Sequence, residues 1–274
     1  MINPQEQWAI QIDVTNKCNR ECSNCTRCVP HIHKPFFMSV EFFAKACDAL
    51  KDFPNESIPN SFTPSRKVVG MLGGEPLLHP QFDELCRTMV SIIPNKEHRG
   101  LWTGIRWQST AHADLIESTF GYINNNLHNS ECLHSPVLVA SADIIADKQE
   151  RAAIQDKCWL QEKWSGAITP KGFFFCEVAA ALDMLFDGPG GLPVTAGCWG
   201  TPLDGFMVQR ERWCDRCGIS LNLRGRRDSE RLDDISKSNL ELLKNSPRVR
   251  DCSFLLATSE TIFGQDDKPW QYLK

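Results

Sequence analysis

The sequence predicts an α/β protein built on a sheet of parallel strands. Strand-like and helix-like segments alternate over roughly the first 140 residues, as expected for connected strand–helix units. Two of the strand-like runs end in short loops, one rich in cysteine and the other in glycine. Ligands in α/β folds bind beyond the carboxyl ends of the strands, so these loops are where a functional site is expected.

The individual elements follow from residue periodicity and from capping residues. Trp8 to Val14 alternates apolar and polar residues, the pattern of a half-buried strand. Ser39 is a suitable N-cap for a helix that extends to Phe53 with an apolar stripe. The other expected elements are strands at 68–72, 100–107 and 136–140, helices at 81–93, 113–125, 177–186 and 233–244, and a β-hairpin between Cys158 and Cys176.

Three cysteines follow the first strand in a C-x3-C-x2-C spacing: Cys18, Cys22 and Cys25. Thiolates suit iron–sulfur clusters, zinc or copper(I), and the spacing alone does not select among them. The second loop, Gly73-Gly74-Glu75-Pro76, follows the strand at 68–72. Its glycines allow the backbone to approach a ligand closely, and its proline stiffens the exit from the turn.

Together these two loops resemble the radical SAM superfamily, over residues 8 to 145. The resemblance implies that the three cysteines bind three irons of a 4Fe-4S cluster, while S-adenosylmethionine (SAM) chelates the fourth iron. The residues that it implies for SAM are Gly73, Gly74, Glu75 and Pro76, which grip the amino group, and Ser141 and Asp143 in the turn after strand four. The chain departs from the family at Asn24, where an aromatic residue usually stacks near adenine.

Alternatives remain for the cysteine loop and for the two residues after strand four. Cys22, Cys25 and Cys28 also form a C-x2-C-x2-C spacing, so a zinc knot or a cluster fully ligated by four cysteines would satisfy the same loop. For Ser141 and Asp143, the competing role is the N-cap of a helix.

A second group of cysteines comprises Cys158, Cys176, Cys214 and Cys217. Their order and approximate spacing resemble the twitch domain, a shorter relative of the SPASM domain, in short radical SAM enzymes of the butirosin aminocyclitol dehydrogenase type. The resemblance implies an auxiliary 4Fe-4S cluster. A structural zinc site is the alternative, and Cys198 is a possible replacement for one of the four ligands.

The expected architecture is a truncated partial (β/α) barrel of parallel strands followed by a small cysteine-rich domain of β-hairpin and helix. The barrel is shorter than in fuller members of the family, because only one short helix fits between Asp143 and Cys158. The expected division is 1–150 for the radical SAM core, 151–227 for the twitch-like domain, and 228–274 for a C-terminal helix and tail.

Composition limits the location and the partners. The 274 residues carry a net charge of −4 and show no basic stripe, so nucleic acid is not the expected partner. The polar start and the lack of a long apolar run predict a soluble, cytoplasmic protein without membrane contact. In that reducing compartment, the 13 cysteines are expected to be metal ligands or buried thiols and not disulfides.

The implied activity is that of an oxidoreductase. The resemblance implies reductive cleavage of SAM to a 5′-deoxyadenosyl radical, which takes hydrogen from a small polar substrate such as a sugar or aminocyclitol. The auxiliary cluster would accept an electron in a net oxidation, and flavodoxin or ferredoxin would supply the reducing electron. No general base stands out, because Glu177, Asp183 and Arg224 are only nearby in sequence.

Two other functions are kept open. One is a maturase that modifies a peptide or protein, although such enzymes usually carry an extra winged domain, for which no length is expected before residue 8. The other is a non-enzymatic iron–sulfur or zinc-binding module, which iron counting would separate from an enzyme with two clusters.

Overall fold

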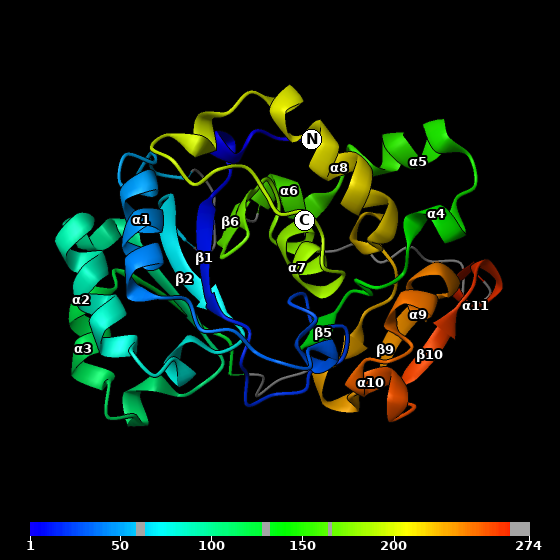
Figure 1. Cartoon of the computed structure of the whole chain (residues 1–274), viewed down its shortest axis with the longest axis horizontal. Helices are drawn as coiled ribbons and strands as arrows, with labels where there is room; N and C mark the ends of the chain where they lie inside the picture. The colour runs from blue at the N-terminus through cyan, green and yellow to red at the C-terminus, as the bar shows by residue number, and fades with distance from the viewer. Residues whose placement is uncertain (59–63, 128–131, 164–165, 264–274) are drawn as a thin grey trace.

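The centre of the protein is an open six-stranded sheet (Figure 1). The computed structural model describes residues 1–58, 64–127, 132–163 and 166–263. The strand order is β4-β3-β2-β1-β6-β7, in which the first five strands run parallel and β7 is antiparallel to β6. The strands are β1 (Ala9–Thr15), β2 (Val68–Gly73), β3 (Arg99–Thr103), β4 (Tyr122–Asn125), β6 (Gly166–Thr169) and β7 (Gly172–Phe174).

This topology confirms the predicted fold class. The predicted hairpin is also present, and its strand β6 pairs with β1, placing Gly166 opposite Ile10 and Ile168 opposite Ile12. The hairpin therefore extends the sheet on the side of β1 that β2 to β4 leave open. The division of the chain into three domains stays a prediction.

Helices cover the sheet and link it to the C-terminal part of the chain. Helices α1, α2 and α3 lie together on one face of the sheet, and α7 lies toward the C-terminal elements (Figure 1). Ser39 caps α1 as predicted, because its Oγ accepts a hydrogen bond of 3.1 Å from the amide of Phe42. The helices are α1 (Val40–Leu50), α2 (Phe82–Ile92), α3 (Ala113–Thr119), α4 (Ser141–Ile144), α5 (Lys148–Gln155), α6 (Trp159–Lys163), α7 (Glu177–Leu185), α8 (Met207–Trp213), α9 (Lys237–Leu243), α10 (Pro247–Arg250) and α11 (Ser259–Phe263).

Strand β1 is buried along its whole length, whereas its alternating pattern predicted a half-buried strand. Its apolar residues belong to the same core as Phe43 of α1 and Leu85 of α2. Its polar residues point to the opposite face, where Gln11 and Asp13 contact the buried side chain of Arg27. The polar face is buried against Arg27, which contacts both side chains.

One helix prediction and one strand prediction in this part of the chain are wrong. The helix expected at 113–125 ends at Thr119, and the chain turns at Gly121, whose amide donates to the carbonyls of Lys96 and Arg99 before β4 begins. Residues 136–140 form no strand, although they are apolar. Their carbonyls accept isolated hydrogen bonds from separate segments instead of a neighbouring strand. Gly218 N donates to Val137 O at 3.1 Å, and Ser236 N donates to Leu138 O at 3.2 Å.

The C-terminal part contains two further small sheets. Strand β9 (Asp233–Ser236) pairs in parallel with β10 (Phe254–Ala257), and β5 (Leu133–His134) pairs with β8 (Arg226–Arg227) in antiparallel fashion. The helix predicted from Asp233 therefore begins only at Lys237, as α9. The strand forms because the carboxylates of β9 are engaged by the cysteine loop, as described below.

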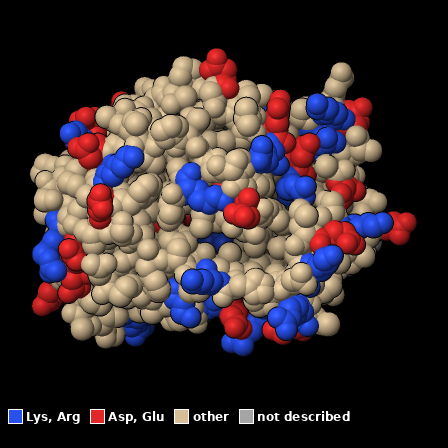
Figure 2. Space-filling view, in the orientation of Figure 1, with Lys and Arg blue, Asp and Glu red and all other residues tan. Residues whose placement is uncertain are grey.

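Charged side chains of both signs are interspersed over the face in Figure 2, where neither sign forms a continuous area. Within the described part of the chain, no helix has both the length and the apolar character needed to cross a membrane.

Candidate metal and cofactor centre

The cysteine loop after β1 and the glycine turn after β2 lie against each other at the carboxyl edge of the sheet. The amide of Gly74 donates to Thr15 O at 2.7 Å, and the amide of Glu75 donates to Lys17 O at 2.8 Å. A Cβ added to Gly73 would lie 2.0 Å from Thr15 O, and one added to Gly74 would lie 2.3 Å from Lys17 O. Glycine is therefore required at both positions for this close approach.

Glu75 connects the glycine turn to the end of β3. Its carboxylate is buried and accepts hydrogen bonds from Thr103 Oγ1 at 2.8 Å, Gly104 N at 2.8 Å and Leu77 N at 3.1 Å. A carboxylate offers about four acceptor positions, so about one remains for a further donor. Burial raises the pKa of Glu75, while these hydrogen bonds lower it.

Cys18, Cys22 and Cys25 are partly exposed residues of the cysteine loop. Burial raises the pKa of Cys18 to about 11 and that of Cys22 to about 12, and a negative charge on Cys25 raises both further. The charge of Glu75 also raises the pKa of Cys18. The three thiols and Glu75 thus share one electrostatic neighbourhood, in which a bound cation would favour the thiolates.

Cys28 differs from these three thiols. Its side chain is 1% exposed and packs in the main apolar core, and its backbone is left-handed with φ of 52°.

Across the described ranges, no group of three or more His, Cys, Asp or Glu side chains is gathered closely enough to hold a single metal ion.

Arg20 ties the cysteine loop to the ends of two other parallel strands. Its Nη2 donates to Gly104 O at 2.8 Å, just after β3, and to Leu127 O at 3.0 Å, just after β4. Together with the glycine turn, these bonds join the loop to the carboxyl ends of β1, β2, β3 and β4. This is the edge at which α/β folds bind ligands.

Asn24, which stands where the resemblance leads one to expect an aromatic residue, has a structural role in this chain. Its backbone is left-handed with φ of 47°, a conformation that asparagine tolerates better than an aromatic residue does. Its Nδ2 donates to Asp234 Oδ2 at 2.9 Å, and its Oδ1 accepts from Asp234 N at 2.9 Å. The side chain therefore fastens the loop to β9.

The second group of cysteines surrounds one cavity. Its lining combines four thiols with apolar residues and two amide side chains: Cys158, Cys176, Cys214, Cys217, Phe175, Leu182, Trp213, Gln155 and Gln161. Burial raises the pKa of Cys214 to about 12 and raises those of Cys176 and Cys217 as well. The structure thus brings together four residues that are up to 59 positions apart in the sequence.

Cys198 lies elsewhere. It begins the short helix η6 (Cys198–Gly200), and the preceding amide of Gly197 donates to Ala49 O near the end of α1. Among the five cysteines considered for this group, the structure places Cys158, Cys176, Cys214 and Cys217 around the cavity.

Ser141 and Asp143 do not follow a strand, so the basis on which they were predicted to contact SAM is wrong. Ser141 Oγ donates to the carbonyl of Cys214 at 2.9 Å, and Asp143 Oδ2 accepts from Ser238 N at 2.8 Å in the first turn of α9. The N-cap of α4 is Ala140, so neither residue caps its own helix. Ser141 instead helps to hold the loop that carries Cys214.

A buried charge network that the local sequence pattern did not reveal lies between the two thiol groups. Arg27 Nε is 3.2 Å from Asp13 Oδ2, and its Nη2 is 3.1 Å from Glu177 Oε2, in the residue after Cys176. Burial raises the pKa of Asp13 to about 6, although Arg27 opposes this shift. The only local sign was a charged residue between Cys25 and Cys28 and a carboxylate on a central strand.

The other residues considered as a general base have separate settings. Glu177 joins the Arg27 network, whereas buried Asp183 pairs with Lys171, whose Nζ lies 3.2 Å from Asp183 Oδ1. Glu177 and Asp183 therefore belong to two different ion pairs, one with Arg27 and the other with Lys171.

Comparisons with known proteins give a structural likeness only. No protein-family model matches the sequence, and no curated protein matches it. Among solved structures, BtrN in complex with AdoMet and 2-DOIA matches at 15% identity and a TM-score of 0.42, over 76% of this chain and 87% of that chain. Selenomethionine BtrN in an open conformation matches at 15% identity and a TM-score of 0.44, over 76% of this chain and 86% of that chain.

Proposed function

We propose that this chain is a radical SAM oxidoreductase that acts on a small polar substrate bearing hydroxyl groups. The observation that carries the proposal is the direct contact between the cysteine loop and the glycine turn, made by Gly74 N to Thr15 O at 2.7 Å and Glu75 N to Lys17 O at 2.8 Å. Two motifs that the chemistry requires to act together are therefore adjacent, at the carboxyl edge of parallel strands.

In this proposal, Cys18, Cys22 and Cys25 hold a 4Fe-4S cluster that leaves one iron for SAM. The partial exposure of these residues supports the assignment, since a ligand must reach the cluster from solvent, whereas Cys28 is turned into the core. When bound, the cluster and SAM would supply a 5′-deoxyadenosyl radical that removes hydrogen from the substrate. The glycine turn, with one acceptor position left on Glu75, is the proposed site for the amino group of SAM.

The second proposed centre is an auxiliary 4Fe-4S cluster on Cys158, Cys176, Cys214 and Cys217. The donor set fits, because four thiols line one cavity whose other walls are mostly apolar. Four cysteine ligands would leave no open iron, so this centre would exchange an electron and would not bind substrate. Burial among apolar residues is one of the factors that set the potential of such a cluster.

A net oxidation is the proposed outcome, with a sugar or aminocyclitol as the substrate class and flavodoxin or ferredoxin as the electron donor. A peptide or protein maturase uses the same two centres and is the alternative enzyme. The competing non-enzymatic function, an iron–sulfur or zinc module, predicts a different metal content. About eight irons per chain would support two clusters, and zinc in their place would exclude the proposal.

The experiment is anaerobic reconstitution with iron and sulfide, followed by reduction and measurement of 5′-deoxyadenosine formed from SAM. The wild type should form 5′-deoxyadenosine, and Cys22→Ala should not. Cys252→Asn is a matched control, because Cys252 is exposed and its φ of 53° suits asparagine. Formation of 5′-deoxyadenosine by Cys22→Ala at the wild-type level would refute the assignment of the first centre.

A further inference from the structure

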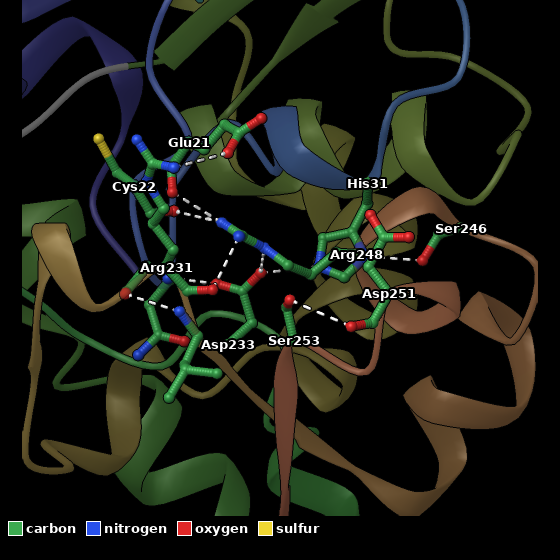
Figure 3. A network of polar contacts seen from close by, with 12 residues as sticks. Glu21, Cys22, His31, Arg231, Asp233, Ser246, Arg248, Asp251 and Ser253 are labelled. Atoms are coloured by element: carbon green, nitrogen blue, oxygen red, sulfur yellow. Dashed lines mark hydrogen bonds and ion pairs between the residues drawn. The ribbon is translucent and has the colours of Figure 1, made fainter.

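The part of the cysteine loop between Cys18 and Cys25 is bonded to the C-terminal part of the chain, more than 200 residues away in sequence. Arg248 Nη2 donates to Glu21 O at 2.8 Å and to Cys22 O at 3.3 Å (Figure 3). The amide of Ser23 donates to Asp228 O at 3.0 Å, and the Oγ of Ser23 accepts from Leu232 N at 3.0 Å. Consecutive residues of the loop are therefore fixed from the same side.

Asp233 is the centre of this arrangement. Its carboxylate accepts hydrogen bonds from the amide of Asn24, from His31 Nε2 at 3.0 Å and from Arg248 Nε at 3.0 Å (Figure 3). Both members of the Arg248–Asp233 ion pair are buried, at 6% and 2% side-chain exposure. A buried, hydrogen-bonded pair is geometrically demanding, and loss of one partner leaves an uncompensated charge.

Arg248 bonds to three segments at once. Besides the loop carbonyls and Asp233, its Nη1 donates to Arg231 O at 2.8 Å. The guanidinium therefore ties the loop, β9 and the segment before β9 together with several donors in a fixed geometry, which the ammonium group of lysine would not reproduce. Asn24 adds a second, independent attachment through its paired hydrogen bonds with Asp234.

We infer that residues 228–250 are a template that holds the cysteine loop in its ligand-binding shape before any metal arrives. The positioning residues are Arg248, which belongs to this template, and Asn24, which attaches the loop to it. A loop of this kind would otherwise lose conformational entropy when it binds metal, and a template removes that cost in advance. The template rests on hydrogen bonds within the chain, and only the identity of the metal rests on the proposed function.

The first test is amide hydrogen exchange of Ser23 and Asn24 in the metal-free protein, for Arg248→Lys and Asn24→Gly. Asn24→Gly keeps a residue that tolerates φ of 47° and removes only the side-chain bonds. We expect exchange at both amides to rise about tenfold or more in each variant, since charged or paired hydrogen bonds are lost. Amides of β1 should keep their wild-type exchange rates, which shows that the effect is local.

Arg250→Lys is the matched control, because Arg250 lies in the same helix α10 but is exposed. It should leave exchange at Ser23 and Asn24 unchanged. Equal exchange in Arg248→Lys and Arg250→Lys, with Asn24→Gly also like the wild type, would overturn the template. If Arg248→Lys does not fold, Asn24→Gly and the control still decide the question.

The second test measures how fast a chelator removes iron from the anaerobically reconstituted protein. Faster loss by several-fold in Arg248→Lys and Asn24→Gly, but not in Arg250→Lys, is the expected result. Increased amide exchange with unchanged iron loss would overturn the positioning role. A wild type that takes up no iron would refute the proposed function, while the exchange measurement would still decide whether the template exists.

Discussion

Replacing Gly74 with alanine tests the contact between the glycine turn and the cysteine loop. The added Cβ would lie 2.3 Å from Lys17 O, and contacts under 3.0 Å force a shift, here of about 0.7 Å or more. The two bonds of 2.7 Å and 2.8 Å that join the turn to the loop would then exceed the normal range of about 2.7–3.2 Å. Loss of two backbone hydrogen bonds is worth about 1–3 kcal/mol in unfolding free energy.

Urea denaturation of the metal-free protein measures this cost. Gly200→Ala is the control, because the nearest atom to its added Cβ is Gln5 Oε1 at 3.8 Å, an ordinary contact. After reconstitution, Gly74→Ala should also bind SAM more weakly than Gly200→Ala, as followed by calorimetric titration. Equal stability and equal SAM affinity in the two variants would show that the turn does not depend on this close approach.

Three further predictions concern the charged and thiol groups of the site. Because burial raises the pKa of Asp13 from 3.8 to about 6, the folded state holds this proton to a higher pH than the unfolded state. As the pH rises from about 4 to about 7, the unfolding free energy of the wild type should therefore fall relative to that of Asp13→Asn, by up to about 3 kcal/mol in denaturation experiments. Parallel pH profiles of the two proteins would contradict this. Cys217→Ala should lower the iron content by about half, whereas Cys198→Ala should retain it, and the reverse result would move the second centre to Cys198. Glu75→Gln places an amide donor where three donors already converge, so the free energy of unfolding should fall by about 1–3 kcal/mol in thermal denaturation. An unchanged unfolding midpoint would argue against the hydrogen bonds of Glu75.

The elements that the sequence predicted well are those with local signals. Strands β1 and β2, helices α1 and α2, and the hairpin β6–β7 have clear periodicity or a turn glycine, and each lies within a few residues of its expected place. The two loops of the first site were found for the same reason, since both consist of consecutive residues at the end of a strand.

The features that the sequence did not reveal depend on partners far along the chain. The run at 136–140 has strand-like residues, but its carbonyls are bonded by Gly218 and Ser236, which no local pattern could indicate. Strand β9 begins with two aspartates, which are unfavourable in strands. The strand forms nevertheless, because Asn24 and Arg248 donate hydrogen bonds to the two carboxylates. Tertiary contacts override local preference in both cases.

The buried network around Arg27 could not be predicted for a related reason. Its members come from β1, the cysteine loop and the start of α7, and the ion pairs form only after these elements are packed. Charged residues are almost never fully buried unless they are paired, so a sequence pattern assigns them to the surface by default.

The most direct test of the central claim is the electron paramagnetic resonance spectrum of the reduced protein, recorded with and without SAM in a Cys214→Ala/Cys217→Ala variant. Without the second centre, the remaining signal reports only the cluster on Cys18, Cys22 and Cys25. We predict that SAM changes this signal, because one iron is available to bind it. A signal that SAM leaves unchanged, with the cluster fully assembled, would contradict the account.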